Sequence, residues 1–330
     1  MKRFRQYLLY LFVRWHAFIL GLLPRRCHRA FAWFWAKILY PVPQLGKVAF
    51  QNVHAVYPDR SVKECKKIAF ESILHLVQVA LEFFWLRRRK KHFPVELIHT
   101  DEASKQCFLS LHDEGRPVIF ITPHHGNWEL AGQMVAMQYG FPLATIMRPP
   151  KNPYLSQFLQ DGRAVDGVRL IFAKGAARAV KNALKEGTSI GMLSDQNTRV
   201  RDGGVFAEFF GFPVPTSSLP ARMAIMENVS VLIGSVCRNP DRTFTMRATV
   251  IHAGEEQDEM KLTSRILNEI EKLVRLCPEQ YLWMYKRFQY IPAEAEETLR
   301  QKYPPYATVA GPTFYDQRAR RDRNKARMQN

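Results

Sequence analysis

An apolar run that ends at a proline and two histidines is the feature of this sequence that most restricts its fold. Residues 118–121, Val-Ile-Phe-Ile, favour a β-strand and lack the alternation of a half-exposed one. Such a run is typical of a strand covered on both faces. After Pro123, Gly126 allows a sharp turn, and Asn127 can cap a helix that begins at Trp128. The sequence therefore predicts a buried strand, a tight turn and a helix.

The predicted turn carries an imidazole and a carboxylate. His124 follows the strand, and Glu129 lies in the first helical turn, where the loop can bring it back onto the imidazole. A neutral imidazole, with a pKa of about 6.5, can take a proton from a hydroxyl while a carboxylate fixes its tautomer. We therefore predict His124 as a general base oriented by Glu129. The spacing equally fits loop histidines satisfied by local hydrogen bonds, with Glu129 favouring the helix N-terminus.

The sequence gives no support for a metal site or a cofactor. It contains no His-Glu-x-x-His motif, and its five cysteines, at positions 27, 65, 107, 237 and 277, form no Cys-x-x-Cys pair. An odd number of scattered cysteines favours a reducing compartment.

Six segments, in order along the chain, resemble the sequence blocks of one enzyme family. The segments are His124–Glu129, Arg148–Pro153, Lys174–Arg178, Asp195–Gln196, Gly203–Gly204 with Phe209–Thr216, and Pro278–Trp283 with Lys286–Phe288. They are similar to the lipid A late acyltransferases, the lauroyl and myristoyl transferases of Gram-negative bacteria. That family belongs to the wider His-x4-Asp/Glu glycerolipid acyltransferase superfamily. The resemblance covers about residues 5–290.

This resemblance implies transfer of a fatty acyl chain from acyl carrier protein to the 3-hydroxyl of an acyl chain on an anionic lipid A precursor. His124 would be the general base and Glu129 its partner. Arg148 is the candidate cation for the oxyanion or for a substrate phosphate; the alternative is a surface arginine beside a proline-rich loop. The candidate substrate-binding residues are Asn127, Arg148, Asn152, Lys174, Asp195, Gln196, Phe209 and Phe210. Asp195 and Gln196 either stabilise the site or form hydrogen bonds to substrate; for Asp195, a helix cap or loop anchor is the alternative role.

Three segments leave alternatives open. His125 stands where the family usually has an apolar residue, so it either competes as base or changes the polarity of the pocket. Residues 186–188 spell the Glu-Gly-Thr motif of the superfamily but precede a predicted strand, and we interpret them as a helix end and turn. Residues 203–216 are expected to form a loop, either against the acyl chain or packed in the core.

Strand and helix patterns alternate along the chain and indicate an α/β fold, a glycerolipid-acyltransferase-like mixed sheet flanked by helices. The predicted strands are 118–122, 143–147, 189–193, 229–237 and 243–251, and the predicted helices are 61–85, 128–139, 176–186, 220–228 and 261–276. Ser61 and Glu64 form a capping box on the first helix, whose apolar stripe serves the core or the wall of an acyl groove. Reactive groups should gather beyond the strand ends, where His124, Arg148, Asp195 and Gln196 follow strands.

Charge and the N-terminus suggest where the protein works. With 48 Lys and Arg against 30 Asp and Glu, the chain carries +18, which favours an anionic partner such as a membrane surface, lipid phosphates, an acidic carrier or nucleic acid. No nucleic-acid-binding signature is present. Residues 7–23 are mostly apolar but contain Arg14 and fall short of the about 20 residues of a span. They predict an amphipathic interfacial helix, with a tilted span as the alternative; a cleaved signal peptide is disfavoured.

We therefore expect three parts, a membrane-anchoring segment (1–40), an acyltransferase domain (41–305) and a basic tail (306–330), on the cytosolic face of the inner membrane. Two other functions remain open. The chain could acylate another glycolipid or a glycerophospholipid, using acyl-coenzyme A, or it could be a basic membrane adaptor without catalysis.

Overall fold

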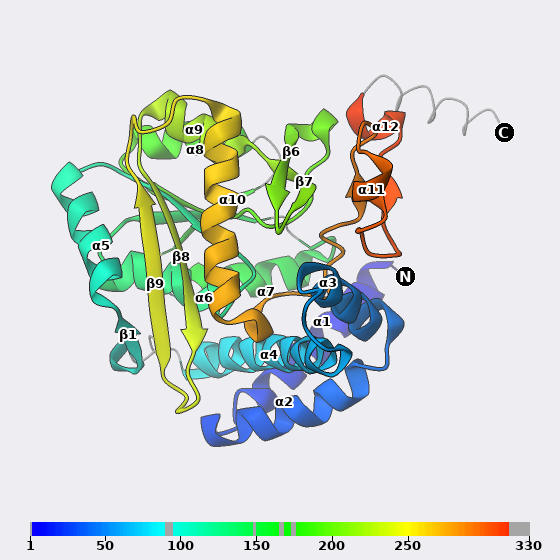
Figure 1. The fold of residues 1–330 in the computed structure, drawn as a ribbon. Helices are drawn as coiled ribbons and strands as arrows, with labels where there is room; N and C mark the ends of the chain where they lie inside the picture. Colours follow the sequence, from blue (N-terminus) through cyan, green and yellow to red (C-terminus); the bar gives the residue numbers. More distant parts are fainter. Residues whose placement is uncertain (1, 90–94, 148–149, 165–167, 173–175, 317–330) are drawn as a thin grey trace.

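A seven-stranded mixed sheet forms the centre of the protein in the computed structural model, which describes residues 2–89, 95–147, 150–164, 168–172 and 176–316 (Figure 1). The strand order is β1-β9-β8-β2-β5-β3-β4. The strands are β1 (Ile98–Thr100), β2 (Ile119–Thr122), β3 (Leu143–Met147), β4 (Arg169–Phe172), β5 (Ser189–Leu193), β8 (Val231–Arg238) and β9 (Phe244–Ile251). Neighbours from β8 to β4 are parallel, β9 is antiparallel to β8, and β1 is parallel to β9.

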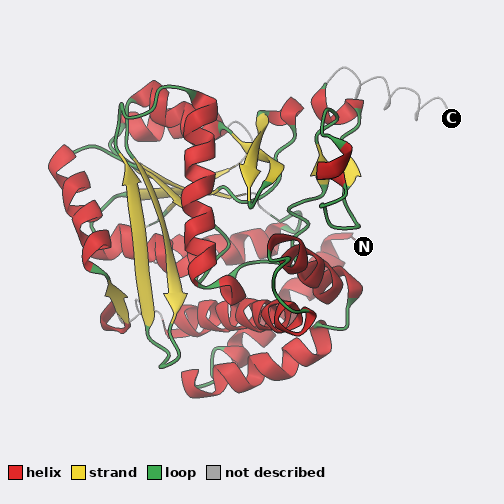
Figure 2. Ribbon diagram, viewed as in Figure 1, coloured by secondary structure: helices red, strands yellow, loops and turns green. Residues whose placement is uncertain are grey.

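Helices cover both faces of this sheet (Figure 2). They are α5 (Glu102–Glu114), α6 (Trp128–Gln133), α7 (Pro153–Ala164), α8 (Ala176–Lys185), α9 (Leu219–Glu227) and α10 (Glu259–Leu276). Alternate residues of β2 enter different cores: Ile119 and Ile121 pack in the cluster that includes Ile266 of α10, whereas Phe120 packs in the cluster that includes Phe108 of α5. The apolar run needs no alternation because both of its faces are buried, which confirms the prediction.

The five predicted strands are all present, with ends within two residues of those expected. The predicted helix 128–139 begins at Trp128 but becomes π-helical over Met134–Gln138. Residues 186–188 follow α8 as a turn, with Gly187 at a φ of 77°. The short edge strands β1 and β4 and the helices α5 and α7 were not predicted.

The expectation of a loop over residues 203–216 is wrong. This segment forms a β-hairpin of β6 (Gly204–Phe209) and β7 (Phe212–Ser217), with Phe210 and Gly211 at the turn in positive φ. The hairpin forms because alternate side chains, such as Phe212 and Val214, enter the main core. The last elements of the described chain are short: β10 (Tyr290–Ile291), α11 (Glu297–Arg300), β11 (Thr308–Val309) and α12 (Pro312–Tyr315).

Four helices precede the sheet: α1 (Lys2–Leu20), α2 (Arg25–Leu39), α3 (Val48–Val56) and α4 (Val62–Arg89). The first turn of α4 has the predicted capping box, in which the Ser61 N–H donates to Glu64 at 2.9 Å and the Glu64 N–H donates to the Ser61 hydroxyl at 3.3 Å. Within the described ranges, α4 alone has a stretch, Val62–Leu86, long and apolar enough to cross a membrane. Since 61% of its apolar window is buried, α4 is a core helix here.

By contrast, α1 and α2 leave much apolar surface uncovered. On α1 a stripe at helical spacing is exposed, with Phe4 at 66% and Trp15 at 60%, and on α2 Trp33 and Phe34 are at least half exposed. The two helices lie side by side with α4 at the lower part of the view in Figure 1. An apolar surface of this kind is unusual for a protein that contacts only water.

Candidate functional site

The candidate site lies where β2 and β5 end side by side. These strands are parallel neighbours in register, with Thr122 opposite Leu193, so the residues after each strand leave the same edge of the sheet. This places His124, two residues after β2, next to Asp195, two residues after β5. The prediction that reactive groups gather beyond the strand ends is confirmed for these two residues. Arg148 and Lys174 lie outside the described residues.

The Asp195 carboxylate holds His124 at two points. One oxygen, Oδ1, lies 2.7 Å from Nδ1 of the imidazole, and the other accepts the backbone N–H of His124 at 2.8 Å. Because an ionised carboxylate only accepts hydrogen bonds, Nδ1 carries the proton in the neutral ring and Nε2 carries the lone pair. The Nε2 atom lies 3.4 Å from the Gln196 side-chain nitrogen. The geometry thus presents a basic nitrogen next to an amide donor.

The electrostatics of the pair favour a charged imidazole. Burial alone would lower the pKa of His124, but the charge and hydrogen bond of Asp195, with a smaller contribution from the charge of Glu129, raise it above its ordinary value. Likewise, burial would raise the pKa of the Asp195 carboxyl, yet His124 and the nearby Arg287 guanidinium lower it. Asp195 is 2% exposed, so its charge acts on the imidazole with little screening by water.

Arg287 supports this pair from inside the core. The side chain is 1% exposed, and its guanidinium donates at 3.0 Å to the Asn197 side chain and at 3.0 Å to the Pro215 carbonyl in the hairpin. It also contacts the Thr216 hydroxyl. A buried cation with these partners fixes β7 beside the loop after β5 and supplies positive charge near Asp195.

The turn that carries His124 is attached to both the sheet and α4. The Gly126 N–H donates to the Gln280 carbonyl at 3.1 Å, and the Asn127 N–H donates to Val236 of β8 at 2.7 Å. From α4, His75 donates through Nε2 to the Gly126 carbonyl at 2.9 Å. Burial lowers the pKa of His75 to about 3, so this donor stays neutral. Contacts to Gln280, β8 and α4 therefore fix the position of the turn that carries the imidazole.

Several predicted substrate-binding residues contact the protein itself. Asn127 caps α6 by accepting the Leu130 N–H, and its amide donates to Glu82 of α4 at 2.7 Å. Asn152 accepts the Tyr154 N–H at the start of α7 and donates to the Gln6 carbonyl at 2.8 Å. The Asn127 side chain therefore links α6 to α4, and the Asn152 side chain links α7 to α1.

Phe209 and Phe210 are both buried in the main core. The Phe210 ring lies 4.7 Å from the Arg275 guanidinium carbon. Both rings therefore pack in the core, which is one of the two roles considered for this aromatic segment.

His125 points away from the site. It is fully buried, with Nδ1 3.3 Å from the Ser235 hydroxyl and Nε2 3.0 Å from the Cys277 carbonyl. Burial lowers its pKa, so the ring is neutral. A second base at this position, which the sequence left open, is contradicted because both ring nitrogens are occupied inside the core.

The sequence does not predict the contacts that four residues make around this turn. It indicates Asp195 as a group that stabilises the site or binds substrate, without pairing it with the imidazole, and it gives no role to His75, Glu82 or Arg287. The contact of Asp195 with His124 was within reach, since each follows a buried strand directly. The other three lie far from His124 in the sequence. His75 and Glu82 carry no local signal, and Arg287 lies in the Lys286–Phe288 block, which by itself indicates no contact partner. Glu129 lies partly buried in the first turn of α6, and its orienting role stays a prediction.

Comparisons with known proteins agree with the resemblance of the sequence blocks. A sequence model of the family described as bacterial lipid A biosynthesis acyltransferase matches residues 2–290. The lipid A biosynthesis palmitoleoyltransferase of Escherichia coli (strain K12) is 24% identical over 280 residues, 78% of this chain and 88% of that protein. The lipid A biosynthesis lauroyltransferase of the same organism is 23% identical over 74% of this chain and 79% of its own. A phosphatidylinositol mannoside acyltransferase of Mycolicibacterium smegmatis is 26% identical over 34% of this chain and 38% of its own.

Replacing Gly126 tests whether the turn requires glycine. Its φ is 58°, and a Cβ atom would lie 2.2 Å from the Val236 carbonyl oxygen. We expect Gly126→Ala to lower the free energy of unfolding by at least about 2 kcal/mol, from backbone strain and this clash. Gly140→Ala is the matched control, because its φ is 67° and nothing lies within 4 Å of its added Cβ. Urea unfolding measures both; equal destabilisation would contradict the close approach.

Proposed function

We propose, from the premise that this chain belongs to the bacterial lipid A biosynthesis acyltransferase family, that it is a late acyltransferase of lipid A. As a member of this family it is an O-acyltransferase. In the proposed reaction, a fatty acyl chain passes from acyl carrier protein to the 3-hydroxyl of an acyl chain on a lipid A precursor. The observation that carries the proposal is the 2.7 Å contact between Asp195 and Nδ1 of His124.

His124 acts as the general base through Nε2. This nitrogen takes the proton of the acceptor hydroxyl, the oxygen attacks the thioester carbon, and a tetrahedral oxyanion forms. The carbon–sulfur bond then breaks, and the thiolate recovers the proton from the imidazolium. Asp195 keeps Nδ1 protonated and, with the charge of Glu129, stabilises the imidazolium. Glu129 shares the orienting role, as first inferred from the sequence.

The developing oxyanion needs a donor or a cation. Gln196 is supported as a donor because its side-chain nitrogen lies 3.4 Å from Nε2 of His124, on the side where the reaction occurs. Arg148 remains our proposal for the cation, acting on the oxyanion or on a substrate phosphate. Lys174 is proposed as a further substrate contact.

A second candidate, acyl transfer to another glycolipid, is favoured by one observation. One relative named for a different acceptor is 26% identical over part of the chain. Mass spectrometry of lipid A from cells with and without this chain separates the two. We expect a mass difference of one fatty acyl unit, and no difference with His124→Ala. An unchanged lipid A together with an altered glycerophospholipid or glycolipid would favour the second candidate.

The pH dependence of transfer tests the roles of the two carboxylates. The base must be neutral, so activity should rise with pH through the pKa of His124, which lies above its ordinary 6.5. Asp195→Asn removes the main cause of that raised pKa, so we expect kcat to fall about 100-fold or more and the acidic limb to move to lower pH.

Glu129→Gln should move the acidic limb in the same direction by less, since its charge contributes less to the pKa of His124. Circular dichroism of each variant provides the control for folding. If Asp195→Asn keeps normal kcat while Glu129→Gln loses it, Glu129 alone orients the imidazole.

We also propose that the first forty residues anchor the protein on the cytosolic face of the inner membrane. The support is the exposed apolar stripe of α1, which includes Phe4, Leu8 and Trp15, together with the arginines of the same segment. The catalytic domain, 41–305, then lies at the lipid surface with its acceptor. The basic tail, 306–330, of which 317–330 lie outside the described residues, is proposed as a further contact with anionic lipid.

Replacing the stripe tests the anchor. We expect the triple variant Phe4→Ser, Leu8→Ser and Trp15→Ser to bind anionic vesicles at least about 100-fold more weakly. Each substitution removes the favourable free energy of transferring an apolar side chain from water into the membrane. Met226→Ser with Leu276→Ser is the control, because both side chains are more than half exposed on other helices. Vesicle flotation measures the partition. Equal binding of the two variants would rule out α1 as the anchor.

A further inference from the structure

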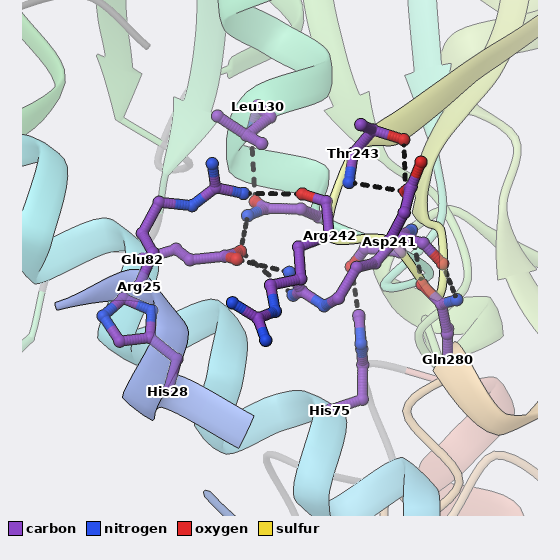
Figure 3. Close-up of polar contacts among 12 residues, drawn as sticks. Arg25, His28, His75, Glu82, Leu130, Asp241, Arg242, Thr243 and Gln280 are labelled. Atoms are coloured by element: carbon purple, nitrogen blue, oxygen red, sulfur yellow. Dashed lines mark hydrogen bonds and ion pairs between the residues drawn. The ribbon is translucent and has the colours of Figure 1, made fainter. Parts of the chain in front are cut away.

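A second polar site lies behind the turn that carries His124. A cavity of about 780 Å³ opens between α2, α4 and the turn from β8 to β9. Figure 3 shows Arg25 and His28 from α2, His75 and Glu82 from α4, and Arg242 gathering around it. Neither His124 nor Asp195 is among the described residues that line this cavity. The proposed reaction therefore assigns no function to this cavity.

The walls of the cavity carry an excess of positive charge. Among the described residues, six cationic and four acidic side chains line it. Three of the four carboxylates are already engaged, Glu64 by Ser61, Glu71 by Arg29 and Glu82 by Arg238. Three of the cations have no ion-pair partner in the described part of the chain: Arg60, Lys67 and Arg242. These cations are available to an anion that enters from solvent.

The floor of the cavity is built from buried polar groups. Arg238 and Glu82 form an ion pair with side chains 9% and 3% exposed. The Nε atom of Arg238 and the Nδ1 atom of His28 are buried and have no hydrogen-bond partner among the residues that the structure describes. The Arg238 Nε–H is a donor that a phosphate oxygen can satisfy. Since His28 donates through Nε2 to the Leu23 carbonyl at 3.1 Å, its Nδ1 is an acceptor, which only a hydroxyl or another donor of the ligand can satisfy. Buried polar atoms without partners are rare in native proteins, and they indicate a site that a polar ligand completes.

The position of the cavity favours a lipid headgroup as that ligand. The N-terminal turns of α2 line the cavity with Arg25, His28 and Arg29, while Trp33 and Phe34 of the same helix are exposed. A lipid could place its chains along the apolar surface and its headgroup among the cations. Arginine binds phosphate oxygens in pairs, and a phosphate monoester offers the most charge of the common headgroups.

We infer that this cavity binds a phosphate monoester headgroup of a membrane lipid. Its wall also holds the catalytic turn, because His75 donates to the Gly126 carbonyl and Glu82 accepts from Asn127. A headgroup bound here lies directly behind that turn. Identifying this lipid as the acyl acceptor rests on the proposed function. The binding of a phosphate headgroup in the cavity is inferred independently of that function.

Binding to the full-length protein tests the inference without relying on catalysis. The probe is dioctanoyl phosphatidic acid, with dioctanoyl phosphatidylcholine as the zwitterionic comparison, measured by isothermal titration calorimetry. We expect Lys67→Gln with Arg242→Gln to weaken phosphatidic acid binding about tenfold or more, because two charge-assisted contacts are lost. Arg265→Gln with Lys272→Gln on α10 removes the same charge elsewhere and should leave binding unchanged. Phosphatidylcholine should bind more weakly to the unmodified protein.

Three results would overturn the inference. Equal weakening by both double variants would mean that net charge, and not the cavity, attracts the lipid. Equal binding of the two lipids would exclude recognition of the monoester. Inorganic phosphate binding as tightly as phosphatidic acid, with the same sensitivity to the cavity variants, would assign the site to free phosphate. If the protein binds phosphatidic acid as expected but transfers no acyl chain, that result would count against the proposed function and not against this inference.

Discussion

The contact between a buried carboxylate and an imidazole is the interaction on which the proposed reaction depends. Asp195 is almost fully buried, and it uses both oxygens on His124, one on the ring and one on the backbone. The contact to the ring fixes which ring nitrogen is basic, and the contact to the N–H fixes the position of the His124 backbone. A carboxylate could not stay charged in this place without compensation, which the imidazole and the Arg287 guanidinium provide.

The rest of the fold can be understood as a means of holding that pair. Parallel strands β2 and β5 bring the two residues to one edge, and the glycine turn after His124 approaches β8 too closely for any side chain. Helix α4 holds the turn from the opposite side through His75 and Glu82, and α1 and α2 pack on α4. The segment that presents apolar surface is therefore joined through one helix to the turn that carries His124.

The sequence predicted the strands, the turn and the helix start that place His124, because these depend on local patterns. Residues 118–121 are apolar without alternation, and glycine, asparagine and tryptophan follow in the order of a turn and a helix start. It did not predict that Asp195 contacts Nδ1 of His124, since the order of β2 and β5 in the sheet is a long-range property. The expectation of a loop over residues 203–216 was also wrong, because side chains of this segment are buried alternately and it forms a hairpin. The partners of the turn on α4 lie about fifty residues away, beyond any local signal.

The most direct measurement of the central claim is the tautomer of His124 in the intact protein. Nitrogen-15 NMR of histidine-labelled protein, with His124→Gln to assign the signal, reports which ring nitrogen carries the proton above the pKa. We expect protonated Nδ1 and unprotonated Nε2 in the native protein, with that preference lost in Asp195→Asn. Protonation of Nε2 in the native protein would contradict the account, because the nitrogen facing Gln196 would then have no lone pair with which to accept a proton.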